Sequence, residues 1–205
     1  MKPLKLLLLF IFLMGCSQKA RTQNNGEPNT GVENRYRSYG EKLIAKGFLK
    51  YADHSKIENL KFQLLNNFAI YEDDYFKMVS IDAEELAEFN FDFFLPQLNK
   101  LLEKRKIGLT VKLAEDYEKT NDLIINGERF NLYTKEEFEN RVFWDSAARN
   151  FFRKINEILK NQNLDERFYL LYGGNDLQAM LLTDEQFSII AEYYNTNEKE
   201  RPYAP

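Results

Sequence analysis

The clearest pattern of apolar and polar positions lies between residues 168 and 194. An apolar run at 168–172 is typical of a buried strand, and a second run at 177–182 follows the turn-forming sequence Gly173-Gly174-Asn175-Asp176. Thr183 and Gln186 then have the spacing of a capping box, and apolar side chains follow on one helical face. The segment therefore predicts a β-hairpin that leads directly into a helix.

Two more regions have the pattern of paired strands. Asn126-Gly127 stands between two apolar runs and is the strongest two-residue hairpin signal in the chain. Residues 68–81 also favour a hairpin, with the acidic sequence 72–74 as its turn. Apolar residues alternate with polar ones and glycine over residues 107–113, which predicts a strand with one buried face.

Residues that can cap a helix predict where several helices begin. We expect helices after Asp82, Thr134 and Asp145. The last of these carries a core-facing stripe at helical spacing: Ala148, Phe151, Phe152, Ile155, Ile158 and Leu159. Pro96 is expected in the first turn of a helix. A helix over residues 36–50 would end at Gly47, although Gly40 weakens it, and residues 56–67 fit either a helix or a strand.

Hairpins with helices between them indicate the α+β class. We expect an antiparallel or mixed sheet, built from hairpins, with helices packed on one face. The chain has 205 residues, of which 44% are hydrophobic, enough for the core of one domain. We assign this domain to residues 35–194. Residues 195–205 are polar and are expected to fray.

The N-terminus has the pattern of an export signal. Lys2 and Lys5 precede an apolar run at 6–14, which is too short to cross a bilayer. The run ends in Leu13-Met14-Gly15-Cys16, which resembles the lipobox of bacterial lipoproteins. The resemblance implies that residues 1–15 are a signal peptide, cut after Gly15, and that Cys16 carries a diacylglyceryl group. An ordinary secretory signal followed by a free thiol is the alternative.

Residues 16–34 are then a lipidated cysteine and a disordered tether, because almost none of them is apolar. Two or three acyl chains would hold the protein stably on a membrane. Ser17 follows the cysteine where an aspartate would signal retention; by resemblance to enterobacterial sorting rules, this favours the outer membrane. We expect the domain to face the periplasm.

Charge and residue inventory exclude several kinds of chemistry. The net charge of -4 becomes -6 when the signal peptide, with two lysines and no acid, is removed, and an acidic chain is a poor ligand for nucleic acid. Cys16 is the sole cysteine, so disulfides, thiolate catalysis and cysteine metal sites are excluded once it is lipidated. The single histidine, His54, lies in a polar turn. We expect no metal site and no cofactor.

Paired carboxylates are the remaining catalytic route. The acidic clusters lie at 72–74, 82–85, 115–116 and 184–185, and each is also explained as a solvated turn or a helix N-terminus. The cluster at 72–74 lacks the ligand spacing and glycine of a Ca²⁺ loop. Gly173-Gly174 has neither the Walker spacing nor GxGxxG, so a hairpin turn explains it.

Two functional hypotheses follow. The first is a lipid-anchored binding protein of the cell envelope, without catalytic activity, whose partner is another protein; an immunity-type lipoprotein that neutralises a toxin would suit its small size and acidity. Its candidate binding residues are Trp144, Asn175, Asp176, Tyr193 and Tyr194. The alternative is an envelope hydrolase that acts on glycan or peptide through two carboxylates, one with a raised pKa.

Overall fold

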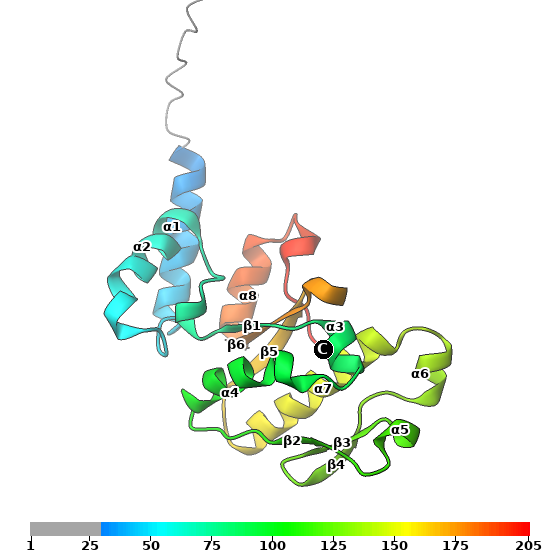
Figure 1. Ribbon diagram of the computed structural model, residues 1–205. Coiled ribbons are helices and arrows are strands. Elements are labelled where there is room, and N and C mark those ends of the chain that lie inside the picture. Colours follow the sequence, from blue (N-terminus) through cyan, green and yellow to red (C-terminus); the bar gives the residue numbers. More distant parts are fainter. Residues whose placement is uncertain (1–29) are drawn as a thin grey trace, which may run out of the picture. The chain divides into compact units, whose positions relative to one another are not determined.

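The hairpin predicted near the C-terminus forms the centre of the fold. A computed structural model describes residues 30–205. In it β5 (Glu166–Leu171) and β6 (Gln178–Thr183) pair antiparallel, and β1 (Met78–Ser80) joins the far edge of β6, giving the order β1-β6-β5 (Figure 1). A short 3₁₀ turn, η4 (Gly174–Asp176), connects β5 to β6, and Gly174 has a φ of 59°.

This sheet is covered by helices on both faces. Successive strand residues point to opposite sides: Phe168 and Leu181 face one hydrophobic cluster, and Tyr169 and Met180 face the other. The predicted α+β class with antiparallel sheets is confirmed, but helices cover both faces of this sheet and not the one face that was expected. The reason lies in the sequence, because a continuous apolar run such as 168–172 buries both faces of a strand, whereas an alternating run buries one.

Each cluster is completed by three helices (Figure 1). On one side lie α1 (Thr30–Ala45), α2 (Ile57–Asn67) and α8 (Asp184–Tyr193). On the other lie α3 (Ala83–Ala87), α4 (Leu95–Glu103) and α7 (Phe143–Asn161). The buried stripe of α7 is the one predicted from the sequence, with Ile158 partly buried at its border.

A second antiparallel sheet extends the cluster that contains α7. Its strands are β2 (Val111–Leu113), β3 (Asp122–Ile125) and β4 (Glu128–Asn131), in that order. The hairpin at Asn126-Gly127 is confirmed, with φ values of 49° and 87°. Leu123 and Ile125 are fully buried in the cluster. Two short helices flank this sheet in the sequence, α5 (Tyr117–Thr120) and α6 (Lys135–Glu139).

Most predicted helix starts are confirmed. Asp82 caps α3, and capping boxes at Thr134 and Thr183 begin α6 and α8. Asp145 is not a cap, because α7 already begins at Phe143; its carboxylate instead binds Arg149, 2.7 Å away, one turn later.

The hairpin expected at 68–81 was wrong, and residues 56–67 are resolved as helix. Phe68, at a φ of 50°, ends α2, and residues 69–72 form no strand. The acidic sequence becomes the 3₁₀ turn η2 (Asp73–Tyr75), and β1 pairs with β6 instead of its neighbour in sequence. Three further 3₁₀ turns are η1 (His54–Lys56), η3 (Phe91–Phe93) and η5 (Glu198–Glu200).

Both ends of the domain differ from expectation. Helix α1 begins at Thr30, inside the segment assigned to the tether, and residues 31–205 form one compact unit. Residues 195–205 do not fray: Tyr203 and Leu170 exchange two backbone hydrogen bonds of 2.8 Å, and Pro202 is buried. Cys16 and the signal peptide lie outside the described residues. Within residues 30–205, no helix has the length and apolar character needed to span a membrane.

Candidate binding surface

The junction of α6 and α7 is an exposed turn with an unusual residue at its centre. The backbone N–H of Arg141 donates to Phe138 O (3.1 Å), and that of Val142 donates to Glu137 O (3.0 Å). These two bonds define a helix ending in which the residue after the cap adopts positive φ, a position that glycine usually occupies. Here it is Arg141, at a φ of 59°.

Three apolar side chains around this turn face solvent. Phe138 is 54% exposed, Val142 49% and Trp144 43%. We call these three residues the aromatic patch. The half-buried Phe143 holds it in place, because its ring centre lies 5.0 Å from that of Phe138 and 5.3 Å from that of Trp144. The two exposed rings of the patch therefore both pack against a third, half-buried ring.

Two hollows flank the patch. One, of about 630 Å³, is lined by Phe138, Glu139, Arg141, Phe143 and Trp144. The other, of about 310 Å³, extends from Arg141 and Trp144 to the glycine turn at 173–174. Arg141 and Trp144 line both hollows, so together they form the ridge between them.

The charged side chains around the ridge differ in whether residues 30–205 supply a partner of opposite charge. Glu139 pairs with Lys135 at 3.6 Å, and Asp145 pairs with Arg149 at 2.7 Å. Arg141 is exposed and makes no ion pair or side-chain hydrogen bond to any residue of 30–205. The ridge therefore presents one cation that the described chain leaves uncompensated.

The structure separates the five candidate residues into three places. Trp144 lies in the aromatic patch. Asn175 and Asp176 are exposed on η4 and line a different, polar hollow of about 320 Å³, together with Lys199 and Glu200. Gly173 and Gly174, which precede them, line the smaller hollow beside Trp144, so these two places adjoin each other.

Tyr193 and Tyr194 lie elsewhere and have a structural role. The ring of Tyr193 is 3.9 Å from that of Phe68 and 5.4 Å from that of Tyr39, measured between centres. Burial raises the pKa of Tyr193 to about 12. Both tyrosines are half-buried. Their rings therefore help to hold α8 against α1 and α2.

Phe138, Val142 and Arg141 were not predicted from the sequence as binding residues. A usable signal was present: Val142, Phe143 and Trp144 are consecutive apolar residues where one helical pattern stops and another begins. Three consecutive apolar residues cannot all follow the core-facing stripe of a helix, so at least one of them is left toward solvent.

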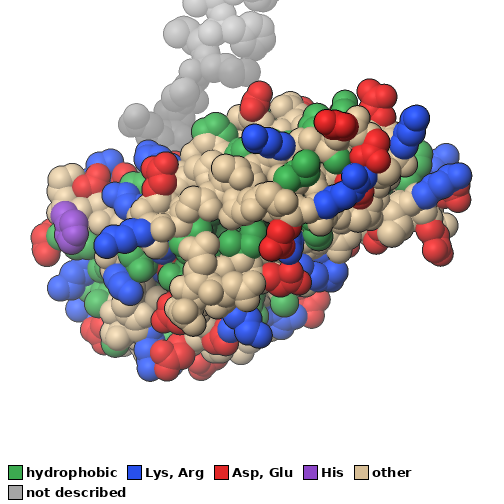
Figure 2. Space-filling model, turned by 90° about the horizontal axis from the view of Figure 1, so that it is seen from below, with side chains coloured by type: hydrophobic (Ala, Val, Ile, Leu, Met, Phe, Trp, Pro, Cys, Tyr) green, Lys and Arg blue, Asp and Glu red, His purple; other side chains and the backbone are tan. Residues whose placement is uncertain are grey.

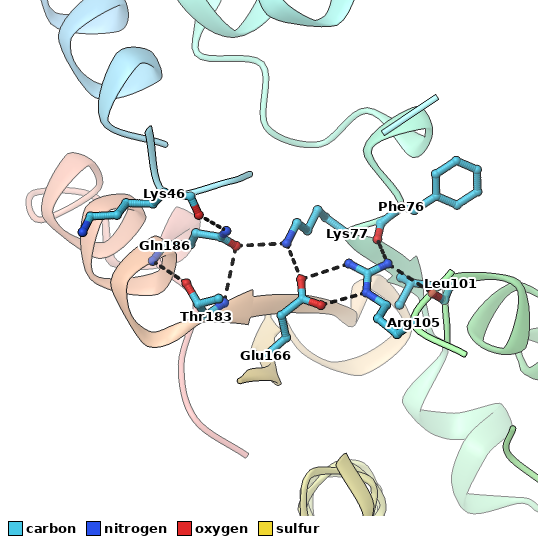
Figure 3. A network of polar contacts seen from close by, with 8 residues as sticks. All are labelled: Lys46, Phe76, Lys77, Leu101, Arg105, Glu166, Thr183 and Gln186. Atoms are coloured by element: carbon cyan, nitrogen blue, oxygen red, sulfur yellow. Dashed lines mark hydrogen bonds and ion pairs between the residues drawn. The ribbon is translucent and has the colours of Figure 1, made fainter. Parts of the chain in front are cut away.

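A buried polar network links the two halves of the fold (Figure 3). Glu166 accepts two hydrogen bonds from Arg105, at 2.8 and 3.0 Å, and one from Lys77. Lys77 also donates to Gln186 Oε1 at 3.0 Å, and Gln186 donates to Lys46 O at 2.8 Å. Side chains from α8, β5 and the segments beside β1 and α4 thus meet around one carboxylate.

Two cations share that single carboxylate. Burial, with the added repulsion of Arg105, lowers the pKa of Lys77 to about 8, although Glu166 opposes the shift. Burial alone would raise the pKa of Glu166, but the hydrogen bonds and charges of Arg105 and Lys77 lower it. A lysine with a lowered pKa can be a nucleophile. However, the side chains of Lys77 and Glu166 are 1% and 3% exposed and line none of the hollows described above, so we assign the network to stability.

Within residues 30–205, the carboxyl groups whose pKa shifts do so in the direction opposite to that of a general acid. The pKa values that shift are all lowered, by hydrogen bonds or nearby cations, at Asp53, Asp122, Glu128, Glu137 and Glu166. A carboxylic general acid requires the opposite shift.

In the part of the chain described here, no cluster of three or more metal-ligating side chains occurs. His54 is exposed in η1. Figure 2 shows acidic and basic side chains interspersed over the face it displays.

Comparisons of this chain with protein-family models, curated proteins and solved structures give no match.

Proposed function

We propose that this protein is a lipid-anchored binding protein of the cell envelope, held at the outer membrane by Cys16 and recognising a protein partner without catalysing a reaction. The aromatic patch of Phe138, Val142 and Trp144 is the binding surface. An immunity-type role, in which the partner is a toxin, belongs to this class and would show as protection of the producing cell.

This proposal rests on the clustering of the exposed apolar side chains of the aromatic patch around the half-buried ring of Phe143. Phe62 and Phe93 are as exposed, at 59% and 57%, yet within residues 30–205 neither ring has an aromatic neighbour. Isolated exposed apolar residues are ordinary, whereas a contiguous group beside a hollow is typical of an interaction site. Aromatic anchors in such a position carry a large share of binding energy.

Site-specific crosslinking tests this proposal in the producing cell. A photoreactive benzoyl-phenylalanine replaces Phe138 in one strain and Phe93 in another, and both are irradiated. We expect a discrete protein adduct from position 138 and none from position 93. Equal labelling at both positions, or none at either, would contradict the proposal. A single carboxylate substitution, such as Asp176→Asn, that kept fold and adduct but abolished function would favour the hydrolase alternative.

A further inference from the structure

We infer that the ridge formed by Arg141 and Trp144 docks a segment of the protein partner that carries a carboxylate next to an apolar or aromatic side chain. This inference rests on the proposed binding function and specifies the chemistry of the partner. The apolar side chain occupies the larger hollow, between Phe138 and Trp144, and the carboxylate binds the guanidinium of Arg141.

Charge complementarity selects this occupant. Both acidic residues nearest the ridge already have basic partners, whereas Arg141 has none in the described chain. A guanidinium presents several N–H donors in a planar fork that matches a carboxylate. A partner with a positive charge at this position would meet like charge, and a purely apolar one would bury the guanidinium without a hydrogen-bond partner.

The backbone at Arg141 determines how its replacement by glycine should affect stability. Arg141 occupies a left-handed position at which an L side chain is strained and glycine is relaxed. Retaining arginine there lowers stability relative to glycine, and the side chain forms no contact with another charge of the fold that would compensate. The strain lies within the candidate surface, between two of its three apolar residues.

Lys106 provides the matched control. It follows α4 as Arg141 follows α6: Lys106 N donates to Glu103 O at 2.9 Å, Ile107 N donates to Leu102 O at 3.2 Å, and φ is 60°. It is also basic and exposed. A cation near the C-terminal end of a helix is favoured by the helix dipole, so this position tests that simpler explanation. Lys106 lines neither hollow beside the ridge.

The test uses a random library of twelve-residue peptides displayed on phage. The library is selected on the domain, residues 30–205, and depleted on its Trp144→Ala variant. Peptides that survive are synthesised, and their affinity is measured from the fluorescence of Trp144, the single tryptophan of the chain. We expect the survivors to share an aspartate or glutamate next to an apolar residue, and replacing that acid by its amide should weaken binding.

The variants then separate binding from stability. Arg141→Gly should raise the thermal midpoint of unfolding and weaken peptide binding by roughly tenfold or more, the usual size of a lost charged hydrogen bond. Lys106→Gly should raise the midpoint as well but leave affinity within about twofold. Survivors without a shared acid, no enrichment over Trp144→Ala, or unchanged affinity of Arg141→Gly would each overturn the inference.

The crosslinking experiment distinguishes the two proposals. If Phe138 still crosslinks to a partner when Arg141 is glycine, with undiminished yield, the binding function stands and the acidic chemistry is wrong. If position 138 gives no specific adduct in the unaltered chain, the binding function itself fails.

Discussion

The side chain of Asn156, on α7, is hydrogen-bonded to both backbone groups of Phe168. Its amide donates to Phe168 O at 3.0 Å, and its carbonyl accepts from Phe168 N at 2.6 Å. Two residues further along β5, the backbone N–H and C=O of Leu170 bond to the backbone of Tyr203, whose hydroxyl also donates to Tyr172 O at 2.7 Å. The outer edge of β5 is therefore covered by the side chain of Asn156 and the backbone of Tyr203, which protects it from pairing with another chain.

Replacing Asn156 should show how much its bonds to Phe168 contribute to stability. Asn156→Ala leaves the N–H and C=O of Phe168 without partners in a buried place, so we expect the free energy of unfolding to fall by about 1–3 kcal/mol. Denaturant titration measures the change. Asn161→Ala, at the exposed end of the same helix, is the control and should change it by no more than about 0.5 kcal/mol. Equal effects at the two positions would show that the contact with Phe168 has no energetic role.

The buried network should depend most on its carboxylate. Glu166→Gln leaves Lys77 and Arg105 as two buried cations without a counter-charge, and we expect a loss of about 3–5 kcal/mol. Glu157→Gln breaks a surface pair with Lys154, whose atoms are 3.5 Å apart, and should cost less than about 1 kcal/mol. Denaturation at pH 7 compares them. A small loss for Glu166→Gln would mean that water solvates the cations or that another group neutralises them.

Lys77 should make stability rise with pH above neutrality. Its folded-state pKa of about 8 lies below the ordinary value of 10.5, so between these values the unfolded chain keeps a proton that the folded chain has released. The free energy of unfolding therefore increases through this window, with a limiting slope of about 1.4 kcal/mol per pH unit. Glu166, Arg105 and Asp165 are the charged groups around the amine.

Lys77→Met is the comparison for this pH effect. It retains the pair of Arg105 with Glu166 and should reduce the rise between pH 7.5 and 9.5, below the range in which exposed tyrosines ionise. Denaturant titrations at several pH values measure both proteins. An identical pH dependence in the variant would assign the rise to another group.

Gly40 should resist replacement by a better helix former. A Cβ added there would lie 2.7 Å from the carbonyl oxygen of Leu64, because α1 and α2 cross closely at this point. We expect Gly40→Ala to destabilise the protein by about 1–3 kcal/mol despite the helix propensity of alanine. Gly108→Ala has no atom within 4 Å of its new Cβ and serves as the control in the same thermal melts. An increase in stability at position 40 would show that the helices can separate without cost.

Cys16 should carry lipid in the mature protein. Cys16→Ser is expected to leave the precursor uncut or to release the domain from the membrane fraction, since both processing and anchoring would require the thiol. Mass spectrometry of the mature N-terminus should find an acylated cysteine. An unmodified Cys16 on membrane-bound protein would show that something else retains it.

Local signals predicted much of this fold, and the reasons are visible at particular residues. Asn126-Gly127 and the capping boxes at Thr134 and Thr183 involve neighbours within three residues, so the sequence states them directly. The failures involve distant partners. Residues 69–72 resembled a strand, but β1 bonds to β6, and the polar C-terminal segment is held by Leu170.

The candidate surface could be predicted only in part. Trp144 stood out as the single tryptophan, but its neighbours become a patch only because α6 ends at Glu139 and α7 begins at Phe143. Tyr193 and Tyr194 resembled surface anchors because the pattern along α8 does not show that Phe68 and Tyr39 cover them. Exposure depends on which distant residues pack nearby, which a single sequence does not reveal.

The pairing of Val79 with Ala179 also has a consequence for how the chain folds. More than half of residues 30–205 separate these two positions, so β1 has no sheet partner until the β5–β6 hairpin has formed. Closing such a long loop lowers the entropy of the chain before the strand contacts that offset this loss can form, and folding is slower for that reason. During synthesis, β1 therefore has no strand partner until most of the chain has emerged, and its backbone N–H groups should be among the last to gain protection from hydrogen exchange as the protein folds.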